Sequence, residues 1–196
     1  MKESPADNKS KILTYNISDI TPYINWPYFY YAWSMNGKAK DAQQELKQDA
    51  EAMLASMEGQ YHTRAVFALC EANSDGDDLL INGTRTPMLR QQRVKEGKPN
   101  LCLADFVRPL SSGITDTVGL FATSVDQAIT TDNEADTYLH MLSQTLSDRL
   151  AEATAERMHE EVRRKYWGYA PDEQLTIAEL YAEKYQGIRP AIGYPS

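Results

Sequence analysis

Apolar residues recur at helical spacing in two long segments of the chain. One stripe consists of Leu46, Ala50, Met53, Leu54 and Met57. It predicts a helix that Asp41 caps and that ends at about residue 57. The other stripe predicts a long helix over about 134–166, roughly 50 Å in length at 1.5 Å per residue. Its members are Leu139, Leu142, Leu146, Leu150, Ala153, Met158, Val162 and Tyr166.

Between these helices the pattern changes to short apolar runs bounded by turn residues, which predicts strands. The runs lie at about 64–70, 79–82, 101–107 and 117–124, and a short helix follows at about 177–185. Residues 20–36 hold a dense aromatic cluster typical of a core or a pocket wall. The pattern indicates the α+β class, with a twisted, largely antiparallel sheet flanked by helices. We expect a flexible lead-in over 1–19 and a single domain over 20–196.

An acidic segment at 71–78 invites comparison with a calcium-binding loop. In an EF-hand register beginning at Glu71, Gly76 would be sixth and Asn82 twelfth, where a bidentate glutamate is required. The flanking segments are also predicted strands rather than helices. The segment therefore predicts a hairpin turn built on Asp75 and Gly76.

The chain offers little for catalysis. Of its three histidines, His140 and His159 would lie about 28 Å apart along one helix, and His62 has no partner at ligand spacing. The sequence contains no nucleophile elbow and no glycine-rich phosphate loop. We therefore predict neither a metal site nor a catalytic residue. Cys70 and Cys102 lie in apolar runs, so we expect buried free thiols.

The net charge of −8 narrows the choice of partners for these 196 residues. An acidic chain argues against non-specific nucleic-acid binding and is compatible with a cationic ligand or a basic protein partner. No apolar run approaches the ~20 residues of a membrane helix, and the first ten residues are polar. We predict a cytoplasmic protein that binds neither nucleic acid nor membrane.

Acidic residues stack along one part of the long helix. Asp148, Glu152 and Glu156 lie four apart, where like charges oppose one another by a few tenths of a kcal/mol per pair. Arg149 offers the local relief. Two favourable pairs are expected further along, Glu160–Arg164 and Glu161–Lys165. The acids form either a solvated face or a site where Glu152 meets a cationic ligand or a distant arginine.

The segment 189–194 combines groups suited to gripping a flat, charged ligand. Arg189 presents five fixed donors to a carboxylate, and Pro190 restricts its backbone to extended conformations. Gly193 permits close approach of the main chain, and Tyr194 adds a stacking face and a hydroxyl. A proline-rich tail without a ligand is the other interpretation, because Pro and Gly commonly mark turns.

Taken in order, short motifs over roughly 20–196 resemble the activation domain of cobalamin-dependent methionine synthase. No single motif is specific, but the ordered set is. The motifs are Asn-Trp-Pro-Tyr-Phe-Tyr-Tyr-Ala-Trp-Ser-Met-Asn-Gly-Lys (25–38), Ala-Asn-Ser-Asp-Gly-Asp-Asp (72–78), Arg-Gln-Gln (90–92), Leu-Ala-Asp-Phe-Val (103–107), Asp-Arg-Leu-Ala-Glu-Ala (148–153), Trp-Gly-Tyr-Ala-Pro (167–171) and Gln-Gly-Ile-Arg-Pro-Ala-Ile-Gly-Tyr-Pro (186–195).

This resemblance implies S-adenosylmethionine as the ligand and an accessory role in a methyltransferase, without independent turnover. In the family, oxidation leaves cobalamin as inactive cob(II)alamin. Flavodoxin or a similar reductase then supplies an electron, and S-adenosylmethionine supplies the methyl group. No cobalamin-binding Asp-x-His-x-x-Gly motif is present, so cobalamin and its binding domain would belong to another domain or chain.

Residue roles follow from the same resemblance. It implies that Arg189 holds the ligand carboxylate, that the backbone at Ala191 meets the adenine, and that Tyr194 borders the reactive end. Glu152 and Glu183 match acidic positions lining the family's site. Carboxylates suit S-adenosylmethionine, which carries a sulfonium and an ammonium.

The sequence departs from the family at Asn25, where aspartate often helps to hold the ligand's ammonium. Losing that charge-assisted bond costs ~1–3 kcal/mol, or about 5- to 150-fold in affinity. Ile192 replaces a usual proline, and longer family members continue past this loop. Two other functions stay open. One is a protein-interaction module with weak or no S-adenosylmethionine binding, and the other is an independent methyltransferase, for which no general base is visible.

Overall fold

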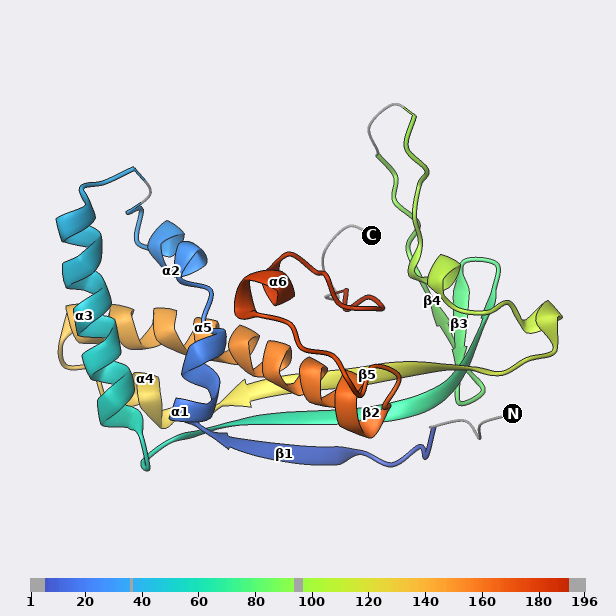
Figure 1. Ribbon diagram of the computed structural model, residues 1–196, viewed down its shortest axis with the longest axis horizontal. Coiled ribbons are helices and arrows are strands. Elements are labelled where there is room, and N and C mark those ends of the chain that lie inside the picture. The colour runs from blue at the N-terminus through green and yellow to red at the C-terminus, as the bar shows by residue number, and fades with distance from the viewer. Residues whose placement is uncertain (1–5, 36, 94–96, 191–196) are drawn as a thin grey trace. The chain divides into compact units, whose positions relative to one another are not determined.

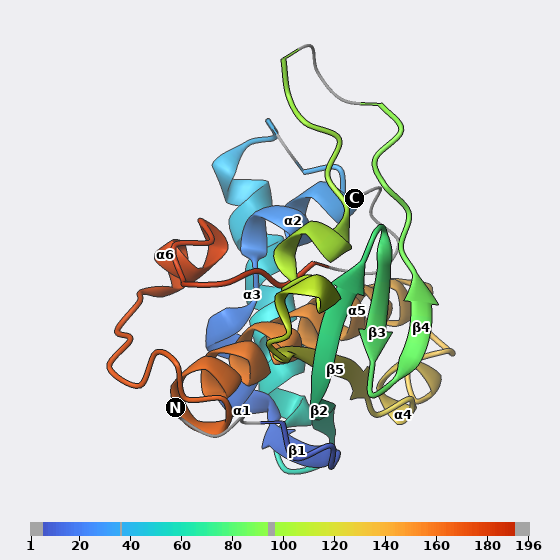
Figure 2. The ribbon, with the colours of Figure 1, turned by 90° about the vertical axis from the view of Figure 1, so that its right-hand side faces the viewer.

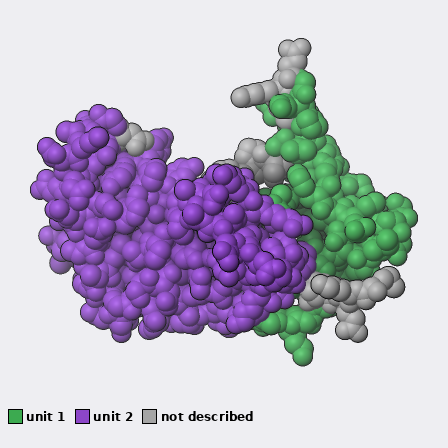
Figure 3. All heavy atoms as spheres, in the orientation of Figure 1, with its two compact units in different colours: residues 1–11, 67–121, 187–196 green, residues 12–66, 122–186 purple. Residues whose placement is uncertain are grey.

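The computed structural model describes residues 6–35, 37–93 and 97–190. Its described residues fall into two compact units, coloured separately in Figure 3. Unit 2 comprises 12–66 and 122–186, and unit 1 comprises 1–11, 67–121 and 187–196. The domain prediction for 20–196 stays a prediction.

A five-stranded sheet runs in the order β1-β2-β3-β4, with β5 also paired to β2. The β2–β3–β4 ladder is antiparallel and is seen face-on in Figure 2. The predicted α+β class with a largely antiparallel sheet is confirmed. The strands are β1 (Lys11–Asn16), β2 (His62–Asp75), β3 (Asp78–Ile81), β4 (Thr84–Pro87) and β5 (Asp116–Val125).

The helices gather in unit 2, on one side of its strands (Figure 1). Alternate residues of β2, including Thr63 and Ala65, are buried, as expected when one face of a strand is covered. The α-helices are α1 (Ile17–Ile20), α2 (Trp26–Ala32), α3 (Lys40–Met57), α4 (Ala128–Thr131), α5 (Thr137–Glu161) and α6 (Ile177–Tyr181).

The long helix α5 organises the core of unit 2. Asp136 caps it by accepting hydrogen bonds from the backbone of Tyr138 and Leu139, at 2.8 and 2.9 Å. Most of the predicted stripe is buried, whereas Leu139 is 39% exposed. A π-helical segment, η4 (Val162–Tyr166), continues the helix to its predicted end. The hydroxyls of Thr154 and Thr63 hydrogen-bond at 2.8 Å, joining α5 to β2.

Two sequence predictions fail near the N-terminus. Residues 11–19 of the expected lead-in form β1 and most of α1, which ends at Ile20, because Tyr15, Ile17 and Ile20 supply buried anchors among polar neighbours. The N-cap of α3 is Ala39 rather than Asp41, which lies in the first turn. In the first turn the Asp41 carboxylate still stabilises the helix, because its negative charge lies near the positive end of the helix dipole.

Unit 1 has its own small core, built around Leu79, Cys102 and Ala104. Both cysteines are free and buried, as predicted. The hairpin turn is also confirmed, since Asp75 pairs with Asp78 and Gly76 has a positive φ of 62°.

The strand predicted over 101–107 is wrong, because that segment contains the 3₁₀ helix η2 (Leu103–Phe106). The side chain of Asp105 accepts from the backbone N–H of Cys102 at 2.8 Å and closes the turn locally. Two further short helices are η1 (Thr21–Tyr23) and η3 (Leu110–Ser112).

Candidate functional site

Glu152 lies on the exposed face of α5, with 62% of its side chain accessible. Both carboxylate oxygens accept hydrogen bonds from the Arg149 guanidinium, at 2.7 and 3.1 Å. Glu152, the acid predicted to face a cation, is thus paired with Arg149, which lies one helical turn earlier on α5. A bidentate pair satisfies the carboxylate while leaving it near solvent, so a cationic ligand would have to share Glu152 with Arg149.

Asn25 occupies the N-cap position of α2. Its Oδ1 is buried and has no hydrogen-bond partner among residues 6–35, 37–93 and 97–190. A buried acceptor left unsatisfied costs about 1–3 kcal/mol, which a ligand N–H can recover. This geometry fits the role predicted for Asn25, as acceptor for an ammonium group.

A polar cluster holds the backbone just before Asn25. The Tyr23 hydroxyl donates to Glu160 at 2.5 Å and accepts from Arg157 at 3.0 Å. Burial raises the pKa of Tyr23, and its bond to Glu160 raises it further. Burial opposes ionisation of Glu160, but hydrogen bonds from Tyr23 and Arg164 lower its pKa overall. The cluster therefore keeps the Glu160 carboxylate of α5 charged where it meets Tyr23 of η1.

A further hydrogen bond links the segments of two predicted site residues. The Tyr181 hydroxyl donates to the backbone oxygen of Tyr23 at 2.6 Å. Tyr181 ends α6 two residues before Glu183, and Tyr23 ends η1 two residues before Asn25. Burial, followed by the charge of Glu156, raises the pKa of Tyr181 to about 12. Tyr181 is thus protonated and able to donate throughout the neutral range.

Glu183 is exposed and has a left-handed backbone, with φ of 54°. It follows Ala182, the C-cap of α6, in the position that glycine commonly takes. A non-glycine residue there costs about 1–2 kcal/mol. α6 begins with a capping box in which Thr176 and Glu179 each bond the other's backbone.

The residue pattern did not reveal a buried ion pair at the end of α5. Arg163 is fully buried and Glu173 is 8% exposed. The Arg163 Nε lies 3.1 and 3.0 Å from the two carboxylate oxygens, and Nη2 donates at 2.5 Å. The Tyr185 ring lies 4.4 Å from the guanidinium carbon. Tyr185 precedes Arg189 by four residues in the sequence.

The π-helical segment changes the pairing predicted on α5. Glu160 and Arg164 do pair, at 2.8 Å. Glu161 instead contacts Arg157, at 3.1 Å, so the predicted Glu161–Lys165 pair is wrong. A π turn places an extra residue in each turn, which shifts side chains off the i, i+4 register beyond residue 161.

The proposed ligand loop is only partly described. Arg189 is half-buried and belongs to unit 1. Glu152, Glu183 and Asn25 belong to unit 2. Ala191, Gly193 and Tyr194 lie outside the described residues. The structure thus brings three predicted site residues into one unit, two of them on segments joined by the Tyr181–Tyr23 bond.

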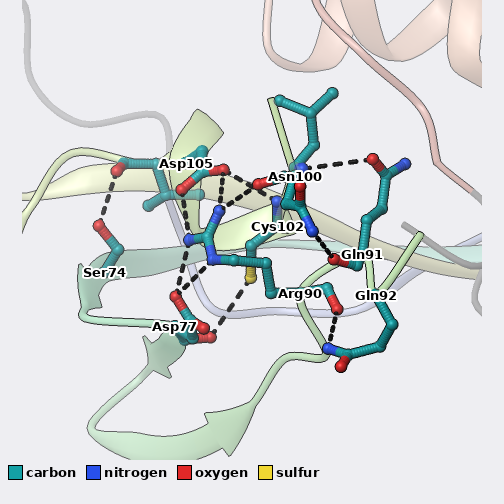
Figure 4. Close-up of polar contacts among 10 residues, drawn as sticks. Ser74, Asp77, Arg90, Gln91, Gln92, Asn100, Cys102 and Asp105 are labelled. Atoms are coloured by element: carbon teal, nitrogen blue, oxygen red, sulfur yellow. Dashed lines mark hydrogen bonds and ion pairs between the residues drawn. The ribbon is translucent and has the colours of Figure 1, made fainter. Parts of the chain in front are cut away.

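Arg90 gathers several motifs that are scattered in the sequence (Figure 4). Its guanidinium donates to Asp77 Oδ1 at 2.6 Å and to both Asp105 oxygens at 2.8 Å. It also donates to the Asn100 backbone oxygen at 2.7 Å. Hydrogen bonds from Arg90 and from the Cys102 backbone lower the pKa of Asp105 to about 2. These motif residues support the fold of unit 1.

Within the described part of the chain, no group of three or more histidine, cysteine or acidic side chains is arranged to hold a metal ion. That part of the chain also contains no helix with the length and hydrophobicity needed to cross a bilayer.

The fold and these residues define an α+β module that carries acidic side chains on its helical unit and Arg189 in the other unit. A family model described as the activation domain of vitamin B12-dependent methionine synthase matches residues 16–196. The chain belongs to this family, as the ordered motifs predicted.

A solved structure supports the same assignment. A crystal structure of the MetH reactivation domain bound to AdoHcy matches with a TM-score of 0.86 and 39% sequence identity. The match covers 96% of this chain and 66% of that one. This chain therefore spans less than two thirds of the length of that relative.

Proposed function

We propose that this chain binds S-adenosylmethionine and acts as a reactivation module for a cobalamin-dependent methionine synthase. Its family membership and its likeness to a reactivation domain bound to AdoHcy carry the proposal. Bound S-adenosylmethionine supplies the methyl group in the reductive methylation of cob(II)alamin. Cobalamin would come from another domain or chain, and the electron from flavodoxin or a similar reductase.

The protein's own residues would bind and orient the ligand. Arg189 would hold its carboxylate, and the buried Oδ1 of Asn25 would accept from its ammonium. Glu152 and Glu183 would stabilise the positive charges. The loop completes the site through the Ala191 backbone at the adenine, through Gly193, which permits close approach, and through Tyr194 near the reactive end.

Isothermal titration of S-adenosylmethionine into the full chain tests ligand binding. We expect Arg189→Ala to abolish measurable binding, because the bidentate, charge-assisted pair with the ligand carboxylate is lost. Arg93→Ala is the matched control, since Arg93 is an exposed arginine of the same unit, and it should leave binding unchanged. Absence of binding to the unmodified chain would favour the interaction-module alternative.

Asn25→Asp is expected to tighten S-adenosylmethionine binding by about 5- to 150-fold, because a charged acceptor would face the ammonium. The same titration measures this change. Asn73→Asp provides the control, since it makes the same substitution in unit 1. Unchanged affinity in Asn25→Asp would remove Asn25 from the site.

The two adenosyl ligands separate the roles of the acids. S-adenosylmethionine carries a sulfonium charge that AdoHcy lacks, so Glu183→Gln should weaken the first more than the second. Equal weakening of both ligands would argue against any contact between Glu183 and the sulfonium.

A further inference from the structure

A hollow of about 480 Å³ lies in unit 2, and none of the proposed ligand-binding residues that the structure describes lines it. One wall is α3, and the other is formed by the chain from the end of α4 into α5. The Tyr138 hydroxyl donates to Asp49 at 2.5 Å and joins the two walls. The Tyr61 hydroxyl donates to Asp132, also at 2.5 Å. These bonds give the hollow a defined frame.

The α3 wall is a regular helical stripe. Its lining positions within α3 are 49, 52, 53, 56 and 57, the spacing of one face of a helix, and Gln60 lines the hollow from the turn that follows. From 49 to 57 these positions extend about 12 Å along the axis, or roughly two turns. The hollow is therefore an elongated groove that matches a short helix in length.

The floor of this groove is apolar and its rim is accessible. Met57 is 2% and Leu142 is 1% exposed, whereas Leu139 and Tyr138 are 39% and 41% exposed. Met53 lies between them in exposure and also lines the groove. Methionines adapt to varied apolar surfaces and are common at protein-binding grooves.

The two stretches of chain that line the groove are acidic, and their nearest basic neighbours in sequence, Lys47 and Arg149, lie just outside them. Residues 49–61 contain three carboxylates and 128–148 contain four, with no lysine or arginine in either stretch. The chain as a whole has 20 basic residues to 28 acidic ones, so this local absence is unusual. The carboxylates are Asp49, Glu51, Glu58, Asp132, Glu134, Asp136 and Asp148.

We propose that this groove binds a basic amphipathic helix of another protein. The apolar floor suits the helix's apolar stripe, the acidic walls suit flanking lysines or arginines, and the length suits about two turns. The interaction is independent of the proposed S-adenosylmethionine site, so either proposal can fail without the other.

The probe is a fluorescein-labelled peptide of about 18 residues, with leucine at i, i+3, i+4 and i+7 and lysine elsewhere. Fluorescence anisotropy at roughly 0.15 M salt measures its binding to the full chain. We expect it to bind at least about tenfold more tightly than a scrambled peptide of the same composition. Equal binding of both peptides would overturn the proposal.

Met53→Glu separates groove binding from simple charge attraction. The substitution adds a negative charge but removes an apolar contact, so the proposal predicts binding weaker by about tenfold or more. Non-specific attraction to an acidic surface would instead make the variant bind more tightly, and that result would overturn the proposal. Circular dichroism would check that the variant is folded.

A matched pair of variants on α3 locates the interaction. Asp49→Asn and Glu51→Gln remove the same charge two residues apart, but only Asp49 lines the groove. We expect Asp49→Asn to weaken peptide binding more. Equal effects would overturn the proposal. So would a dimer of the unliganded chain that Met53→Glu dissociates, since the occupant would then be a second copy.

Discussion

Arginine–carboxylate clusters stabilise both units, but they differ in burial. In unit 2, Arg163 and Glu173 are withdrawn from solvent beneath Tyr185. In unit 1, Arg90 retains 32% exposure and bridges Asp77 and Asp105, which are 49% and 37% exposed. Each guanidinium uses its planar fork to bind carboxylate oxygens.

The difference in burial determines how each cluster supports the fold. A buried pair lacks solvent to replace a missing partner, so removing one member leaves an uncompensated charge. An exposed network stays hydrated and is screened by salt. Arg163 is therefore expected to affect global stability, and Arg90 the local order of unit 1.

The largest expected effect is that of Arg163→Met. Removing one partner of a buried pair costs about 3–5 kcal/mol of unfolding free energy, measured by urea denaturation. The neighbouring Arg164→Met is the control, because Arg164 is 43% exposed and Glu160 keeps its contacts with Tyr23 and Arg157, so a loss of under about 1 kcal/mol is expected. Equal losses in the two variants would remove the distinction between buried and exposed pairs.

A double variant tests why Arg163 matters. Arg163→Met with Glu173→Met removes both charges together and should recover part of the lost stability, because no buried charge remains unpaired. A double variant less stable than Arg163→Met alone would show that Glu173 has a further partner of importance.

A smaller effect is expected from Arg90→Lys, which keeps the charge but loses the fork. The Gln91 amide, which donates to the Leu101 oxygen at 2.8 Å, should exchange with solvent faster. Molar salt should have a similar effect in the unmodified chain. Arg85→Lys, in the separate network with Asp75 and Asp78, is the control. Unchanged exchange in Arg90→Lys would contradict the assigned role.

The smallest effect concerns acid. Because the folded pKa of Asp105 is about 2, below its ordinary 3.8, its contribution is present above pH 3.8 and is lost as pH falls towards 2. Carbon-detected NMR titration should show a midpoint near 2, and Arg90→Gln should move it towards 3.8. A midpoint near 3.8 in the unmodified chain would contradict the Arg90–Asp105 contact.

The sequence predicted features that arise from neighbouring residues. The stripe of α5, the free cysteines, the Asp-Gly hairpin and the Glu160–Arg164 pair all depend on short spacings and are present in the structure. The family also followed from the ordered motifs. All of the proposed site residues were named from the sequence, and their roles stay predictions.

Contacts between distant residues were not predictable from spacing. Nothing local distinguishes Arg163 from Arg164, yet one is buried and the other is 43% exposed. The π-helical segment explains part of this, since it changes the register where α5 ends. The Oδ1 of Asn25 is buried and has no hydrogen-bond partner within the described residues. This state likewise depends on the burial created by α2.

The sequence alone determined the long helices α3 and α5, the hairpin and the family, because periodicity, turn chemistry and ordered motifs are local properties of the chain. Tertiary structure decided which charges are buried, which motifs meet at Arg90, and where the acidic groove of α3 and α5 lies. Each of these depends on segments that are far apart in sequence, and their burial and electrostatics are defined only once the chain has folded.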